Sequence, residues 1–240
     1  RRPAARRCAA RAEVFAPPTV ADTKRKFTEA YPYTIPALYN NVLQELIVQQ
    51  HFTRWAKNYT FDPVMALGLI TVFEQLMDGY RNEEARAAVF AAYVGSMDED
   101  PEEYKKAAAD LEAWAKEQSA ESLVGFKEQN GAVPDALKAV SERAAAGEGF
   151  QYSKYFAVGM FRLLELSNAS EPSTLEKLTE ALGAKKSAVD KDLDIYRGLL
   201  SKLTAAKELM AEFLAREAKK KAEREAEKQE AAQKKEDATA

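Results

Sequence analysis

Apolar residues recur every three or four positions along most of the chain, which is the spacing of one face of an α-helix. One clear example links Leu38, Val42 and Leu46. The same spacing returns in residues 101–115 and 152–166 and again near the C-terminus. The pattern predicts an all-α fold, with a multi-helix globular body followed by a long C-terminal helix of coiled-coil character.

Residues that start and stop helices divide this body into segments. Prolines at first-turn positions and preceding Asp, Asn or Ser residues favour helix starts, whereas Gly79 and Gly183 favour helix ends. Glycine and proline between residues 119 and 149 predict two short helices joined by loops. Ser173 and Glu176 form the capping-box pattern of another short helix. The predicted starts are Asp22, Pro36, Asp62, Asn82, Asp100, Tyr152, Ser173 and Ser187.

The C-terminal segment contains no proline after Ser187 and a single glycine, Gly198. A helix from Ser187 to Lys235 would be about 73 Å long at ~1.5 Å per residue. Its stripe up to Leu203 supports two interpretations, a coiled-coil seam or packing against the protein's own body. After Ala215 large apolar residues vanish, which favours a solvated, charged tail. The stripe consists of Leu193, Tyr196, Leu200, Leu203, Met210 and Leu214.

Three regions are therefore expected along the chain. Residues 1–19 combine a transit-peptide remnant with a linker, because the first twelve are rich in arginine and alanine and contain no acid. Processing is expected between Cys8 and Glu13, and a functional basic arm is the alternative. Residues 20–186 form the helical body, and residues 187–240 form the long helix, first as a coiled coil and then as a charged tail.

Charge and composition exclude several classes of protein. The formal net charge is −3, but the first 26 residues carry eight Arg or Lys against two acids, so the body is acidic. An acidic body repels phosphate backbones, which argues against nucleic-acid binding. One cysteine and one histidine provide neither an internal disulfide nor a zinc cage, and no metal or cofactor is predicted. The most apolar run, residues 64–73, is too short to cross a membrane.

Reactive side chains are few and isolated. His51 is expected to be a surface or hydrogen-bonded structural histidine. The acidic run at residues 98–103 lacks the glycine of a calcium-binding loop and contains Pro101, so it is better explained as a helix N-terminus. The Gly147-Glu148-Gly149 sequence lacks the further glycine of a nucleotide-binding loop.

Aromatic residues gather in one region of the sequence. The favoured interpretation is a core with cation–aromatic contacts at its edge. A pigment- or lipid-binding carrier is the alternative, and it predicts a cavity among Tyr39, Trp55, Tyr59 and Phe61. A hydrolase with converging carboxylates is a third hypothesis, although no spacing singles out a pair among the 38 acids.

Several long strings resemble the thylakoid formation 1 family, photosystem II biogenesis proteins of chloroplasts and cyanobacteria. They occur in family order between residues 20 and 215. The matching strings are VADTKRKF (20–27) with AYP (30–32), YTFDPVMALGLITVF (59–73), FQYSKYFAVG (150–159) and VDKDLDIYR (189–197).

This resemblance implies an all-helical, non-enzymatic protein of the chloroplast, at the thylakoid membrane periphery and in the stroma. It implies a role in thylakoid biogenesis and in photosystem II assembly and repair, through association with the thylakoid FtsH protease. No catalytic residues are carried over, because the family has none established. The expected partner-binding stripe on the last helix is Leu203, Met210, Phe213 and Leu214.

Overall fold

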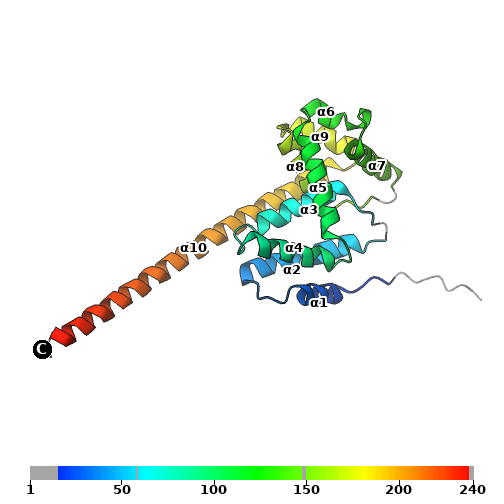
Figure 1. Cartoon of the computed structure of the whole chain (residues 1–240). Helices are drawn as coiled ribbons and strands as arrows, with labels where there is room; N and C mark the ends of the chain where they lie inside the picture. The colour runs from blue at the N-terminus through cyan, green and yellow to red at the C-terminus, as the bar shows by residue number, and fades with distance from the viewer. Residues whose placement is uncertain (1–15, 58, 148–149, 238–240) are drawn as a thin grey trace, which may run out of the picture.

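The computed structural model describes residues 16–57, 59–147 and 150–237, which are helical with no β-strand among them. This confirms the predicted all-α fold, with a long C-terminal helix (Figure 1). The segment interpreted as a transit peptide lies almost entirely outside the described residues. The elements are α1 (Val20–Ala30), α2 (Ala37–Arg54), α3 (Pro63–Leu76), α4 (Glu83–Gly95), α5 (Pro101–Lys116), α6 (Ala120–Val124), the 3₁₀ helix η1 (Phe126–Glu128), α7 (Ala132–Ala146), α8 (Lys154–Leu166), α9 (Pro172–Ala181) and α10 (Lys186–Asp237).

Side-chain caps explain where most of these helices begin. The Asp62 carboxylate accepts hydrogen bonds from the backbone N–H groups of Val64 and Met65, as the Asp-Pro pattern predicts. Asn82 and Asp100 cap α4 and α5 in the same way. These contacts satisfy N–H groups that have no partner within the helix.

Several local predictions were wrong. Helix α8 begins at Lys154 after the Ser153 cap, not at Tyr152, and α10 begins at Lys186, so Ser187 lies inside it. Helix α1 is capped by Thr19, not by Asp22. Asp22 is the third residue of the helix, and its carboxylate accepts a hydrogen bond from the Thr19 backbone N–H.

The described residues 119–147 hold one five-residue helix, one 3₁₀ turn and the fifteen-residue α7, not two short helices. Helix α7 tolerates Pro134 because proline fits the first turn. Helix α9 begins at Pro172 with no side-chain cap, so Ser173 does not form the expected capping box.

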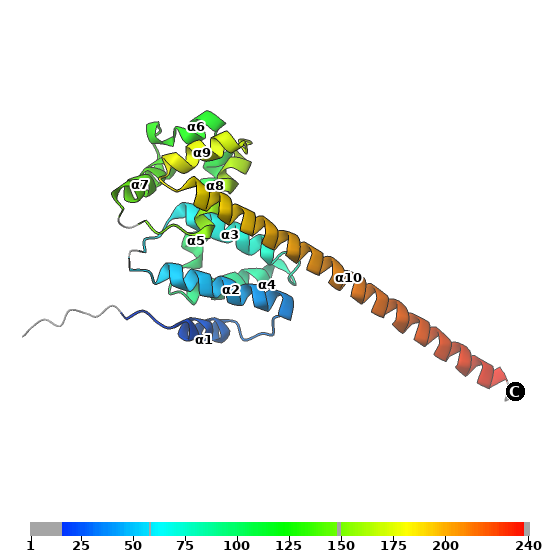
Figure 2. The same cartoon turned by 180° about the vertical axis from the view of Figure 1, so that it is seen from behind.

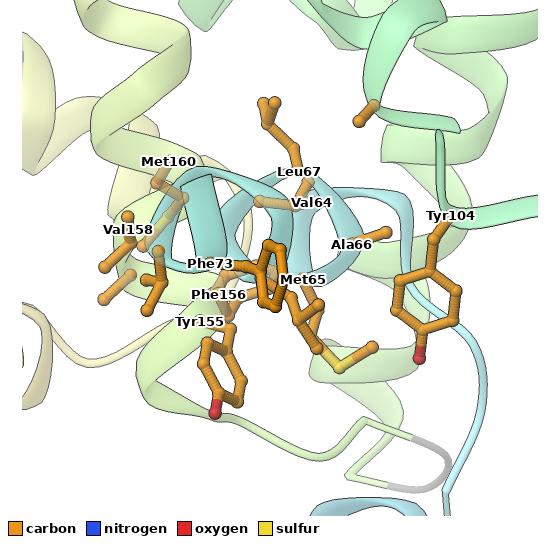
Figure 3. Close-up of a cluster of buried hydrophobic side chains, with 14 of the residues drawn as sticks. Val64, Met65, Ala66, Leu67, Phe73, Tyr104, Tyr155, Phe156, Val158 and Met160 are labelled. Carbon is orange, nitrogen blue, oxygen red and sulfur yellow. The ribbon is translucent and has the colours of Figure 1, made fainter. Parts of the chain in front are cut away.

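Helices α3 and α8 pack closely against each other, and buried side chains from both gather in one cluster (Figure 3). A Cβ atom added to Gly68 would lie 1.8 Å from the Tyr155 carbonyl oxygen, and one added to Gly159 would lie 2.0 Å from the Val64 carbonyl oxygen. The two backbones are therefore in direct contact, and only glycine fits at either position. Most of α3 is buried, which explains why residues 64–73 are almost all apolar.

The other helices surround this pair (Figures 1 and 2). Helices α1, α2 and α4 lie towards one end of the body, and α6, α7 and α9 gather at the other. Helix α10 begins near α9, runs beside α8 and α3, and then extends well beyond the body. The fold thus presents one long helix that is docked over its first part and free of the body over its second.

The glycine crossing is testable by adding single methyl groups. Gly68→Ala and Gly159→Ala should each lower the free energy of unfolding by about 3 kcal/mol, because the new methyl group meets rigid backbone. The control is Gly198→Ala in α10, where a Cβ meets no atom within 4 Å. It should be neutral or stabilise by up to about 1 kcal/mol. Chemical denaturation measures all three, and equal effects would contradict the close contact.

Candidate functional site

The first part of α10 is attached to the body by its apolar stripe. Val189, Leu193 and Leu203 are buried, and Tyr196 and Leu200 are partly buried against the core. Up to Leu203 the stripe therefore packs on the protein's own helices, which decides between the two interpretations for this part of the helix.

Polar contacts secure the same attachment. The Tyr152 hydroxyl donates to Asp192 at 2.9 Å, and the Tyr196 hydroxyl donates to Gln75 at 2.6 Å. Burial raises the pKa of both tyrosines, so both remain protonated donors at neutral pH. Further along, the Lys207 ammonium donates to the Asp78 backbone carbonyl at 2.5 Å, at the turn that follows α3. Lys207 marks the point where α10 leaves the body.

Beyond Lys207 the helix exposes a cluster of large apolar side chains. Met210 is 51% exposed, and Phe213 and Leu214 are each 59% exposed. Leu203, the first residue of the predicted partner-binding stripe, is only 7% exposed and belongs to the body contact. Leu209, 67% exposed, was not predicted, although its four-residue spacing from Phe213 places it on the same side of the helix. We call Leu209, Met210, Phe213 and Leu214 the outer cluster.

A small, partly open hollow of about 60 Å³ lies between α10 and the body. Val42 and Leu46 of α2 form one wall, and Ile195 and Leu199 of α10 form the opposite wall. Its floor comes from α3 and α8, and Glu45, Gln49, Lys154 and Asp192 also line it. Sequence reasoning missed this hollow because its two walls come from segments about 150 residues apart.

The aromatic residues proposed to line a pigment cavity lie in two separate clusters. The Tyr39 ring packs edge-on against Tyr80, 5.2 Å between centroids, and the Phe61 ring packs in the same way on Tyr104. The Arg54 guanidinium lies over the rings of Trp55 and Tyr59 at 4.6 and 5.0 Å. These contacts match the favoured interpretation, a core with cation–aromatic contacts at its edge.

A carboxylate joins the second cluster. Glu99 accepts hydrogen bonds from the hydroxyls of Tyr59 at 2.5 Å and Tyr104 at 2.6 Å, and it forms an ion pair with Arg54 at 3.2 Å. Burial raises the pKa of Glu99, opposed by these partners. Because Arg54 ends α2 and Glu99 precedes α5, the network connects two helices that are distant in sequence.

The remaining candidate groups have structural partners. His51 Nδ1 lies 2.8 Å from the Thr23 hydroxyl, so the histidine links α2 to α1 as a hydrogen-bonded structural residue. Burial raises the pKa of Asp62 to about 6, but its carboxylate caps α3.

Glu74, whose pKa is raised by burial and by Glu112, lines a groove between α3 and α4. Within the described chain, no group of three or more His, Cys, Asp or Glu side chains is arranged to hold a metal ion.

The geometry defines a class of protein, namely a helical body that carries an extended helix with an exposed apolar cluster. Residues 19–225 match the family described as thylakoid formation protein. The chain belongs to this family of thylakoid formation proteins.

Named relatives cover most of the chain. It is 55% identical over 211 residues to the chloroplastic THYLAKOID FORMATION1 protein of Solanum tuberosum, covering 88% of this chain and 72% of that protein. It is 34% identical over 215 residues to Thf1 of a Nostoc species, covering 86% and 92% of the two chains. The solved structure of Psb29 superposes with a TM-score of 0.76 at 28% identity, covering 86% of this chain and all of that one. The helical fold is thus shared with a solved relative.

Removing the Glu99 carboxylate should destabilise the body. Glu99→Ala removes the carboxylate that accepts from both tyrosine hydroxyls, which are then left only the 3.2 Å bond to each other, and it removes the ion pair of Arg54. The free energy of unfolding should therefore fall by about 3 kcal/mol. Glu103→Ala, an exposed position on α5, is the control and should change it by less than about 0.5 kcal/mol. Urea denaturation measures both, and similar effects would show that the network contributes little.

His51 should make stability depend on pH. Burial lowers its pKa, so it stays neutral in the fold, whereas the unfolded chain titrates near pH 6.5. As the pH falls below about 6.5, the unfolded state takes up the proton first and the free energy of unfolding falls. His51→Gln should therefore lose less stability between pH 7.5 and 5.5 than the natural chain. Denaturation at several pH values measures this, and parallel curves would contradict it.

Proposed function

We propose that this chain is a non-enzymatic protein-binding factor for thylakoid biogenesis and for photosystem II assembly and repair. It acts in the chloroplast, at the thylakoid periphery and in the stroma, and it associates with and stabilises the thylakoid FtsH protease. Family membership supports the thylakoid role. Among the described residues, no helix is both long and apolar enough to cross a membrane.

The observation that carries the binding proposal is the outer cluster. Four large apolar side chains lie within two turns of a helix that has already left the body. Burial of one such side chain contributes about 1.5–3 kcal/mol, so a partner that covers the cluster gains substantial free energy. An exposed apolar face at helical spacing is the usual docking site for another helix. Binding to the assembled protease stabilises that assembly by mass action.

The carboxylates of the body fit a binding role better than a catalytic one. Asp62 caps a helix, and Glu99 is occupied by two tyrosines and an arginine. The buried carboxylates of Asp62 and Glu99 therefore make contacts that stabilise the fold.

Truncation after Lys207 tests the proposal, because it removes the outer cluster and keeps every buried residue of α10. The truncated chain should no longer co-purify FtsH from detergent-solubilised thylakoids, while its thermal unfolding stays within a few degrees of the full chain. Met210→Ser with Phe213→Ser should reduce co-purification similarly, and Ala211→Ser with Ala215→Ser on the other side of the helix is the matched control. Undiminished retention of FtsH by the truncated chain would reject the outer cluster as the docking site.

A further inference from the structure

The apolar face of α10 continues inward from the outer cluster. At 3.6 residues per turn, Ile195, Leu199, Ala206, Met210 and Phe213 fall within about 60° of one another around the helix axis. Ile195 is 47% exposed, although it lies in the part of the helix that is docked on the body. Glu217 falls within the same arc and ends the stripe. We call these five residues the α10 stripe.

The inner end of the stripe forms part of a concave site. Ile195 and Leu199 face Val42 and Leu46 of α2 across the hollow described above. Beyond the outer end of this hollow, the Lys207 ammonium lies 6.0 Å from the centre of the Tyr39 ring, so α2 and α10 remain neighbours there. The stripe therefore begins beside a shallow hollow bounded by α2 and α10 and continues along a single free helix.

One flank of the stripe is basic. Lys191, Lys202, Arg216 and Lys220 fall within about 40° of one another, next to the apolar arc. No acidic residue between 186 and 224 falls in that 40° arc. Arg216 pairs with Glu212 at 3.3 Å and Lys220 pairs with Glu217 at 3.5 Å, but such exposed pairs contribute little and exchange readily.

We propose that the α10 stripe and the hollow beside α2 together bind one amphipathic helix of a partner protein, with acidic residues along one edge of its apolar face. From Ile195 to Phe213 the site is about 27 Å long, which corresponds to about 18 helical residues. This inference rests on the proposed function and extends its docking site from the outer cluster into the body.

The shape and charge of the site favour this occupant over two others. A flat membrane surface reaches the outer cluster but not the inner stripe, which faces the wall formed by α2. A second copy of α10 in antiparallel orientation would place its basic flank against the same basic flank, which is repulsive. A helix with an acidic edge meets neither obstacle.

Photo-cross-linking from single positions of the full chain tests the proposal. The photoreactive residue p-benzoylphenylalanine replaces Ile195, Phe213 or, as the control on the opposite side, Ala215. Each chain is incubated with solubilised thylakoids and illuminated, and the adducts are identified by mass spectrometry. Positions 195 and 213 should both cross-link to one amphipathic, acid-flanked helical segment, and position 215 should not.

Two substitutions in the chain that carries the photoreactive group at 213 test the inner site and the basic flank. Ile195→Glu, and separately Lys202→Glu with Lys191→Glu, should each lower the yield of that adduct about tenfold. Glu208→Lys, on the side of the helix away from the stripe, should leave the yield unchanged. Circular dichroism confirms that each variant folds.

The outcomes separate this inference from the proposed function. Adducts from 213 without adducts from 195 would overturn the extended site and leave the outer cluster as the docking site. Adducts that contain only lipid, or only a second copy of this chain, would overturn the proposed occupant. No adduct from either position, while the full chain still co-purifies FtsH, would reject the α10 stripe but not the association. Absence of adducts from both positions, together with loss of FtsH co-purification by the full chain, would reject both the α10 stripe and the association.

Discussion

The direct backbone contact between α3 and α8 determines how the rest of the structure is arranged. Gly68 and Gly159 allow the two helices to approach until a single methyl group would collide with a carbonyl oxygen. At this distance most of α3 is enclosed, so residues 64–73 are almost all apolar. A helix enclosed in this way needs surrounding helices, and α5 and α10 are among those that pack on it.

This central position of α3 also explains how α10 is held. The chain leaves α3 through a turn at Asp78 and Gly79, where Gly79 adopts a positive φ of 76°. That turn offers a backbone carbonyl to Lys207, and Gln75 near the end of α3 accepts from Tyr196. Helix α10 is therefore docked against α8 and the C-terminal part of α3, and it continues freely beyond the turn that follows α3. The length of α3 therefore determines where the exposed outer cluster begins on α10.

The sequence indicated the helices better than the boundary between docked and free surface. Asp62-Pro63, Asn82 and Asp100 gave correct helix starts because capping is a local interaction. The stripe on the last helix was visible, but its regular spacing does not change between Leu203, which is buried, and Met210, which is exposed. Where the body ends depends on tertiary packing, and the wall that α2 provides is likewise absent from any local pattern.

The docked part of α10 has a consequence for binding at its free part. An isolated helix must nucleate before it can present a face, and that step is unfavourable. In this chain the buried residues Val189, Leu193 and Leu203 fix the first turns against the body, so the free turns extend a helix that already exists. A partner then meets a surface whose ordering does not depend on the encounter, which lowers the entropic cost of association. The body thus contributes to recognition by preorganising the helix, even where it makes no contact with the outer cluster.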